Sequence, residues 1–304
     1  MDQLLIGLDV GNTNITGALA SEDGTLIAKL HRTTDRAGGS EAGLQRITEI
    51  TSALMTQAAE SGAHVRRIGV GFGGPVDFER GVVLLSHQTP GWENKPLSAQ
   101  LESQFRTPVI VDNDANAGTL GEWRFGAGRG VNDLLYVNIG TGIGGGVIAN
   151  GRLVRGTQNL AGEVGHIIVR RDGPACTCGK PGCLEACASG SAIGRRGSEA
   201  LGRSVNSKEV FALAASGDDD AQRVLDGVIE DLAHGLGVAI GLLNPALIII
   251  GGGLSEAPES QFLKPLRRAV PRYCLAEAAA KLRIEPAKLR YDAGVMGAVA
   301  LAMT

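Results

Sequence analysis

The chain has 304 residues, of which 43% are hydrophobic and 20% charged, which is ordinary for a globular protein of two usual domains or one large domain. Its formal net charge of −3 and lack of a basic face argue against a nucleic acid or a membrane surface as a partner. The first residues do not form a basic region followed by an apolar region, and no apolar run reaches the ~20 residues of a membrane-spanning helix. Neither a signal peptide nor a membrane anchor is therefore expected. Four of the five cysteines lie close together, which favours the reducing cytoplasm.

Short apolar runs between turn-forming residues dominate the first third of the chain. Strands are predicted at 4–8, 15–20 and 25–30, and the Asp23-Gly24 turn joins the last two as a hairpin. Leu44, Ile47, Ile50 and Leu54 recur at helical spacing and predict a helix at 41–59. The pattern then predicts a strand at 65–72, a loop at 73–77, a helix at 96–105 and a buried strand at 109–112.

The middle of the chain repeats the order of the beginning. A strand at 134–139, a glycine-rich turn at 140–146, a strand to Ala149 and an Asn150-Gly151 turn follow one another. At an offset of 131 residues, Gly11 falls on Gly142 and Leu8 on Ile139. This order predicts two related lobes, each opening with a hairpin whose first turn can approach a phosphate.

Strands and helices alternate through the remainder, which indicates an α/β fold. Helices are expected at 207–215, 221–243, 261–270 and 294–303, and a fully buried strand at 246–250 runs into Gly251-Gly252-Gly253. No disordered linker is evident, so the lobes are expected to be joined by chain crossings.

Two glycine turns and a carboxylate suggest a nucleotide site. Backbone N–H groups at Asp9–Thr13 and Gly140–Gly146 can point at phosphate oxygens, and Thr13 and Thr141 add hydroxyl donors. Neither turn is a P-loop or a dinucleotide-binding turn, and a single one would more often be only a tight turn. Asp9 beside phosphates makes sense if it holds Mg²⁺ through water.

The run Asp112-Asn113-Asp114-Ala115-Asn116 ends a buried strand in polar groups. One interpretation is a helix cap, with Asp114 or Asn116 opening a helix toward Trp123. The other turns Asn113 and Asp114 into a cleft, where Asp114 is the general base on a hydroxyl and Asn113 binds a neighbouring hydroxyl.

One histidine and three cysteines crowd into eighteen positions, at His166, Cys176, Cys178 and Cys183. These are the ligand types of a closed, tetrahedral structural zinc site. Disulfides are the weaker interpretation, because Cys176 and Cys178 are too close to pair comfortably. Two carboxylates that zinc does not need, Glu163 and Glu185, lie among the ligands.

These motifs together resemble the ROK family of sugar kinases and sugar-responsive repressors. The resemblance covers nearly the whole chain and is carried by Asp9-x-Gly-x-Thr13, Gly73-Gly-Pro-Val-Asp77, Asn113-Asp114, Gly140–Gly146, Glu163-x-Gly-His166 and the segment from Cys176 to Glu185. It implies a two-lobed actin-like ATPase fold of the duplicated ribonuclease H type, with a zinc-binding loop. The expected lobes are residues 1–112 with the C-terminal helix 293–304, and residues 113–292.

The resemblance also implies roles for individual residues. Zinc would be held by His166, Cys176, Cys178 and Cys183, with a second, sugar-binding role for His166. Sugar would be bound by Gly73, Asn113, Asp114, Glu163, His166 and Glu185. ATP would lie between the glycine turns, with its site formed by Asp9, Gly11, Asn12, Thr13, Asn14, Thr141, Gly142, Gly251 and Gly252.

The sequence therefore predicts an ATP- and Mg²⁺-dependent hexose kinase with structural zinc, acting on glucose at the 6-hydroxyl, as a homodimer or homotetramer. Two positions depart from the family pattern. Asn12 replaces a glycine, and the segment 86–92, with His87 and Gln88, replaces one that commonly carries an Asn before Gly-Trp. The second departure leaves N-acetylmannosamine, N-acetylglucosamine, allose and fructose as alternative substrates. A repressor or a sugar sensor without turnover is the alternative from another class.

Overall fold

The computed structural model describes residues 3–11, 13–35, 37–86 and 89–304, and these form two compact units. Unit 1 comprises residues up to Gly130, Leu153–Ala161 and Tyr291–Thr304; unit 2 comprises Val131–Arg152 and Gly162–Arg290. Among the described residues, no helix has both the length and the apolar character needed to cross a membrane.

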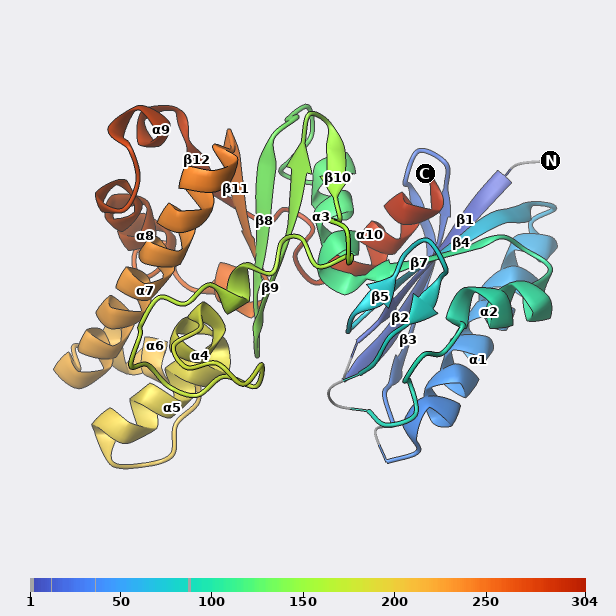
Figure 1. The fold of residues 1–304 in the computed structure, drawn as a ribbon. Coiled ribbons are helices and arrows are strands. Elements are labelled where there is room, and N and C mark those ends of the chain that lie inside the picture. The colour runs from blue at the N-terminus through green and yellow to red at the C-terminus, as the bar shows by residue number, and fades with distance from the viewer. Residues whose placement is uncertain (1–2, 12, 36, 87–88) are drawn as a thin grey trace. The chain divides into compact units, whose positions relative to one another are not determined.

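Unit 1 is built on a five-stranded sheet with the strand order β3-β2-β1-β4-β7 (Figure 1). β1 pairs antiparallel with β2 and parallel with β4, and β4 pairs parallel with β7. The bounds are Gln3–Val10 for β1, Asn14–Ser21 for β2, Leu26–Thr33 for β3, His64–Phe72 for β4 and Val109–Asn113 for β7. The helices are α1 (Gly39–Glu60), α2 (Leu97–Phe105), α3 (Asp114–Arg124) and α10 (Ala293–Ala302), and β5 (Val76–Asp77) pairs with β6 (Val82–Val83).

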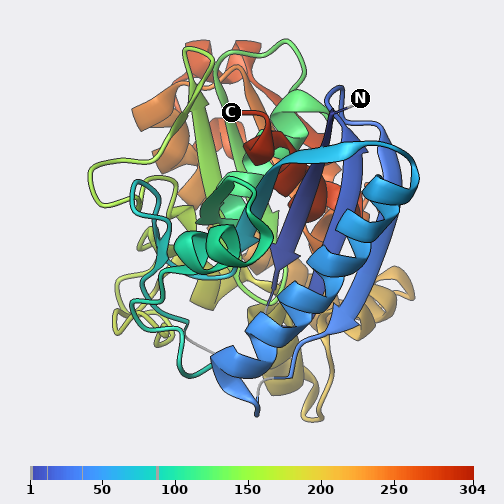
Figure 2. The ribbon, with the colours of Figure 1, turned by 90° about the vertical axis from the view of Figure 1, so that its right-hand side faces the viewer.

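Alternation along β1 separates the two faces of this sheet. Leu4, Ile6 and Leu8 share a hydrophobic core with α1, which crosses in front of the blue strands in Figure 2. Leu5, on the other face, packs against Val295 of α10. Asp9 follows the same parity as Leu5, so its side chain belongs to the face that α10 covers.

Unit 2 repeats this arrangement with a sheet of order β10-β9-β8-β11-β12. In both sheets the order by appearance is third, second, first, fourth, fifth, so the predicted duplication is confirmed. The last residue pair of the hairpin is Val10 with Ile15 in unit 1 and Ile139 with Ile143 in unit 2. Matching these two pairs gives an offset near 129 residues, so the offset of 131 was wrong by two residues. The bounds are Leu134–Ile139 for β8, Ile143–Ala149 for β9, Arg152–Val154 for β10, Leu247–Gly251 for β11 and Arg283–Pro286 for β12.

One hydrophobic core joins this sheet to the helices of unit 2, with the long α7 (Asp219–Leu243) at its centre. Asp218 caps the start of α7 by accepting from Ala221 N–H, and Asn244 ends it in the left-handed conformation. The other helices are α4 (Leu184–Ala188), α5 (Gly190–Leu201), α6 (Ser207–Ala215), α8 (Leu263–Ala269) and α9 (Ala276–Lys281). Short 3₁₀ turns cover Val164–His166, Gly253–Glu256, Val270–Arg272 and, in the stretch before α10, Arg290–Asp292.

The division into units differs from the predicted boundary after residue 112. Unit 1 continues through α3 to Gly130, because α3 packs along α10 and against β4 and β7. It also takes in residues 153–161, which we call the connecting segment. The C-terminal helix α10 belongs to unit 1 and covers one face of its sheet.

Candidate active site

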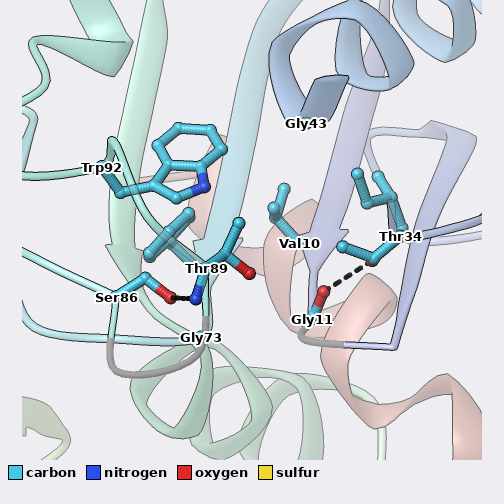
Figure 3. A pocket seen from close by; sticks show the side chains of 10 residues that line it. Val10, Gly11, Thr34, Gly43, Gly73, Ser86, Thr89 and Trp92 are labelled. Atoms are coloured by element: carbon cyan, nitrogen blue, oxygen red, sulfur yellow. Dashed lines mark hydrogen bonds between the residues drawn. The ribbon is translucent and has the colours of Figure 1, made fainter. Parts of the chain in front are cut away.

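The first glycine turn joins β1 to β2 and is tied to neighbouring segments by its backbone. Gly11 N–H donates to Asn14 C=O at 2.9 Å, and Gly73 N–H donates to Val10 C=O at 2.9 Å. The Thr34 hydroxyl donates to Gly11 C=O at 2.9 Å (Figure 3). Gly11, Thr13 and Asn14 thus follow β1, as predicted, and Gly73 is bonded to the last residue of that strand. Asn12 lies outside the described residues.

A small cavity of about 10 Å³ adjoins this turn, lined by Val10, Gly11, Thr34, Gly73 and Thr89 among others (Figure 3). That volume holds about one water molecule, so this cavity is not a sugar pocket. Thr89 N–H donates to the Ser86 hydroxyl oxygen at 3.2 Å, which brings part of the segment 86–92 to the turn. His87 and Gln88 lie outside the described residues. They belong to the segment whose departure from the family pattern leaves other sugars as alternative substrates.

Asp9, one residue before the end of β1, lies against the first turn of α10. A Cβ atom added to Gly294 would lie 2.4 Å from Asp9 Oδ2, so only glycine leaves space for the carboxylate there. Burial and, secondarily, the neighbouring carboxylate of Asp114 raise the pKa of Asp9 from 3.8 to about 7. Two carboxylates that repel each other are a suitable donor set for a divalent cation. Mg²⁺ binds through one or two carboxylates and water.

Asn113 and Asp114 stand where β7 passes directly into α3. Asn113 is the N-cap, because its Oδ1 accepts from Ala115 N–H at 2.9 Å and Asn116 N–H at 3.3 Å. The cap interpretation was therefore wrong in naming Asp114 or Asn116. The Asn113 Nδ2 group donates to Gly74 C=O at 3.2 Å, and Asp114 accepts from Ala115 N–H. Both predicted side chains are half-buried at the end of the strand and held by backbone groups.

The second glycine turn, at the end of β8, is held by a carboxylate from α4. Ile143 N–H donates to Glu185 Oε2 at 2.9 Å. Gly190 N–H, at the start of α5, donates to Gly140 C=O at 2.8 Å. Asn138 of β8 pairs in register with Gly251 of β11, so Gly251-Gly252 and Thr141-Gly142 follow neighbouring strands at the same edge of the sheet.

The predicted zinc ligands converge in unit 2. The ligand atoms of His166, Cys176, Cys178 and Cys183 all lie within 4.8 Å of one another. Cys178 Sγ is 3.5 Å from Cys183 Sγ, and Cys176 Sγ is 3.7 Å from His166 Nδ1. Ligands at tetrahedral zinc distances lie about 3.3–3.8 Å apart, so the donor set fits this ion. The five cysteines are unpaired in this structure, in keeping with the metal-site interpretation.

The environment of the thiols differs within this cluster. Burial raises the pKa of Cys183 to about 12, whereas the backbone N–H of Lys180 lowers the pKa of Cys178. A bound cation would displace the Cys183 proton, since the thiolate is the metal ligand. The second ring nitrogen of His166, Nε2, lies 3.8 Å from Glu163 Oε2, too far for a direct hydrogen bond. The two nitrogens thus face different groups, which permits the two predicted roles of His166.

Three tertiary contacts of the candidate site carry no local sequence signal, although Asp112 and Gly74 lie in segments that the sequence analysis singled out. Gly294 is placed against Asp9 by the packing of α10, 285 positions away in the chain. Asp112 forms an ion pair with Arg155 of the connecting segment, and Gly74 C=O accepts from Asn113. The sequence placed Gly294 at the start of a helix, but which groups these residues contact depends on the tertiary fold.

Comparison with known proteins gives a consistent result over the full chain. The profile of the ROK family matches residues 5–304. A glucokinase from Thermotoga maritima is 36% identical, with 98% of this chain and 96% of the relative covered. The crystal structure of a ROK hexokinase from Thermus thermophilus superposes with a TM-score of 0.86 at 35% identity, covering 98% and 97% of the two chains. A ROK family glucokinase from Streptomyces griseus, solved in complex with glucose and AMPPNP, superposes with a TM-score of 0.82 at 32% identity, covering 98% and 99%.

Proposed function

Because the chain belongs to the ROK family, we propose that it is an ATP-dependent hexose kinase that phosphorylates glucose at its 6-hydroxyl. The similarity to glucokinases extends over nearly the whole of both chains, so it includes every segment that the proposal uses. Phosphoryl transfer depends mostly on positioning and on electrostatic stabilisation, which backbone amides and carboxylates can supply.

The observation that carries this proposal is the proximity of two carboxylates with different surroundings, Asp9 and Asp114. Asp9 lies against α10 at the glycine turn, and its pKa is raised to about 7 by burial and by Asp114. We assign Asp9 to Mg²⁺, which would offset the phosphate charge when bound. Asp114 then accepts the proton of the sugar hydroxyl as it attacks the γ-phosphorus.

The contacts of Asn113 define what it can offer a sugar. Its Oδ1 accepts from two backbone amides, and one N–H of its amide group donates to Gly74 C=O. The second N–H of the amide group can donate to a hydroxyl oxygen. We therefore assign Asn113 as a donor to the hydroxyl next to the one that reacts.

By the resemblance to the family, the other sugar contacts are assigned to Gly73, Glu163, His166 and Glu185. Glu185 accepts from Ile143 N–H with one oxygen, so its second oxygen can accept from a sugar hydroxyl. None of the assigned residues is a permanent cation. Such a set suits a neutral polyol and disfavours sugar acids and sugar phosphates.

ATP is assigned to the two glycine turns and to the end of β11. Asn12, Thr13 and Asn14 in the first turn, with Thr141 and Gly142 in the second, would donate to phosphate oxygens. Gly11, whose N–H is bonded to Asn14 C=O, would let the phosphates approach the backbone of the turn. Gly251 and Gly252 would lie near the adenosine. Zinc, held by His166, Cys176, Cys178 and Cys183, would be structural, because four protein ligands leave no position for a catalytic water.

We also propose a homo-oligomer, a dimer or a tetramer. The supporting observation is a group of exposed apolar side chains at the end of α7, where Leu242 is 79% and Leu243 41% exposed. Light scattering on the purified protein measures its molar mass in solution and tests this proposal. The mass of a monomer at a concentration of about 10 µM would contradict it.

The kinase proposal is tested by incubating the purified protein with glucose, ATP and Mg²⁺. The expected products are ADP and glucose 6-phosphate in equal amounts, identified by ³¹P NMR, with no reaction in excess EDTA. ADP release that does not depend on sugar would contradict the proposal.

A further inference from the structure

We infer that Arg155 is a positioning residue for the Asn113–Asp114 pair and acts through the buried carboxylate of Asp112. This inference rests on the proposed kinase function, since it concerns the residues assigned to the sugar and to its proton. It adds a role for the connecting segment, residues 153–161, which contains no assigned site residue.

Asp112 is a buried charge directly before the two site residues. Its side chain is 1% exposed and follows the parity of Asp9 on the sheet face that α10 covers. Oδ1 accepts from Asn113 N–H at 2.7 Å and from Asn116 Nδ2 at 2.9 Å, and Oδ2 accepts from Arg155 Nε at 2.8 Å. A buried carboxylate is stable only with a partner of opposite charge or several hydrogen bonds, and Asp112 has both.

The amide of Asn116 shows how strongly this carboxylate orders its surroundings. Asn116 is 2% exposed, and its Oδ1 has no hydrogen-bond partner in the part of the chain that the structure describes. The amide thus donates to Asp112 although no described residue pairs with its oxygen. Its orientation follows from the negative charge of Asp112.

Arg155 is itself held in place on two sides. Its guanidinium carbon lies 3.6 Å from the centroid of the Phe78 ring, a close cation–π contact. Phe78 directly follows the loop Gly73–Asp77, whose Gly74 C=O accepts from Asn113. Ala161 N–H donates to Arg155 C=O at 2.9 Å, which closes the connecting segment on this residue.

One arginine therefore contacts both segments that hold Asn113, the end of β7 through Asp112 and the loop 73–78 through Phe78. Without it, Asp112 would be an uncompensated buried charge and would draw water or move outward. Asn113 N–H, bonded to Asp112 Oδ1, would move with it, and Asp114 is the next residue. A displacement of about 1 Å at a reacting group can cost about 100-fold in rate.

The test compares Arg155→Met and Arg155→Lys with wild type in steady-state kinetics at 20 °C. Arg152→Met, at an exposed arginine three residues earlier in the chain, is the matched control. For Arg155→Met we expect kcat/KM for glucose to fall roughly 100-fold, with the KM for ATP within about twofold of wild type. Arg155→Lys should recover about tenfold of the loss, and Arg152→Met should leave all constants unchanged.

A second arm uses Asp112→Asn alone and combined with Arg155→Met. The double variant should be more active than Arg155→Met, because it removes the uncompensated charge and keeps a side chain that accepts from Asn113 N–H. If Arg155→Met alone does not fold, the double variant can be measured in its place. If Arg155→Met folds with a lower melting temperature but keeps kcat and the glucose KM within about threefold, Arg155 is only structural and the inference is overturned.

The outcome separates this inference from the kinase proposal. If wild type phosphorylates no hexose, the kinase proposal fails, and calorimetric binding of glucose decides the role of Arg155. A Kd raised at least tenfold in Arg155→Met supports the positioning role, and an unchanged Kd overturns it. Absence of any hexose binding to wild type overturns both.

Discussion

Asp114 is the residue on which the proposed chemistry depends most directly. It is the first residue of α3, and the N-cap that fixes this turn is its neighbour Asn113. The hydrogen bonds that hold the turn therefore fall mainly on Asn113, and the Asp114 carboxylate remains suited to accept a proton. This separation of positioning from proton transfer leads to a clear mutational prediction.

Asp114→Asn should lower kcat by roughly two to four decades, the usual contribution of a general base. The amide can still hydrogen-bond to a hydroxyl, so the Kd for glucose should change only a few-fold. Calorimetry and a coupled ADP assay measure the two effects. A variant that retains more than about a tenth of wild-type turnover would rule out the assigned role.

Asp9 gives a pH-dependent stability with a defined sign. Its pKa in the folded protein is about 7, against an ordinary value of 3.8, so the folded state holds this proton more tightly than the unfolded state. The stabilising contribution is complete below about pH 4 and is lost as the pH rises to about 7, on the order of 2–4 kcal/mol. Asp9→Asn should therefore raise the melting temperature in EDTA at pH 8, and this gain should disappear near pH 4.

The same substitution should abolish turnover and remove any stabilisation by Mg²⁺. Thermal melts at pH 4, 6 and 8, with and without Mg²⁺, make the comparison. If Asp9→Asn is less stable than wild type in EDTA at pH 8, the carboxylate is not destabilising there and the account of this site is wrong.

At the scale of the element, the start of α10 is shaped for the Asp9 carboxylate. An added Cβ at Gly294 would lie 2.4 Å from Asp9 Oδ2, whereas one at Gly241 in α7 would meet nothing within 4 Å. Gly241→Ala should stabilise the protein by about 0.5–1 kcal/mol, the usual helix preference for alanine. Gly294→Ala should destabilise it and lower turnover more than tenfold, because Asp9 must move. Equal effects of the two substitutions in urea melts would contradict this account.

The zinc-binding loop, residues 163–185, should behave as one structural element. Cys178→Ala or chelation should lower the melting temperature and raise the sugar KM together, because His166 and the adjacent Glu163 lose their support. Cys274→Ala, outside the cluster, is the control. Full activity in freshly purified protein that contains no zinc by elemental analysis would contradict a structural role for the ion.

The sequence predicted most elements because their patterns are local. The strand at 134–139 and the helix at 207–215 agree with β8 and α6 at both ends. α5 was missed because three glycines interrupt its sequence, and two of them, Gly194 and Gly197, are buried where the helix packs. β12 was missed because it has only four residues and forms through its parallel pairing with β11, which is a tertiary feature.

At the scale of the whole chain, the family motifs predicted the duplicated α/β architecture, which the two matching strand orders confirm. They did not predict that α3 and the connecting segment belong to unit 1. That assignment depends on contacts such as Asp112–Arg155, which join residues 43 positions apart and have no periodic signal. The candidate ligands of zinc were predictable because one histidine and three cysteines, the usual ligand types, lie within a short stretch of the sequence.

The measurement that tests the central claim most directly is kcat/KM for glucose against a panel of hexoses, with saturating ATP and Mg²⁺. Mannose and 2-deoxyglucose should be weaker substrates, because a buried group left without its hydroxyl partner costs about 1–3 kcal/mol, and phosphorylated sugars should not react. N-Acetylmannosamine, N-acetylglucosamine, allose and fructose are included because the segment 86–92 departs from the family pattern. We predict that glucose has the highest kcat/KM of the panel. A value at least tenfold higher for any of these other sugars would contradict the glucokinase assignment, and no turnover with any sugar would contradict the kinase itself.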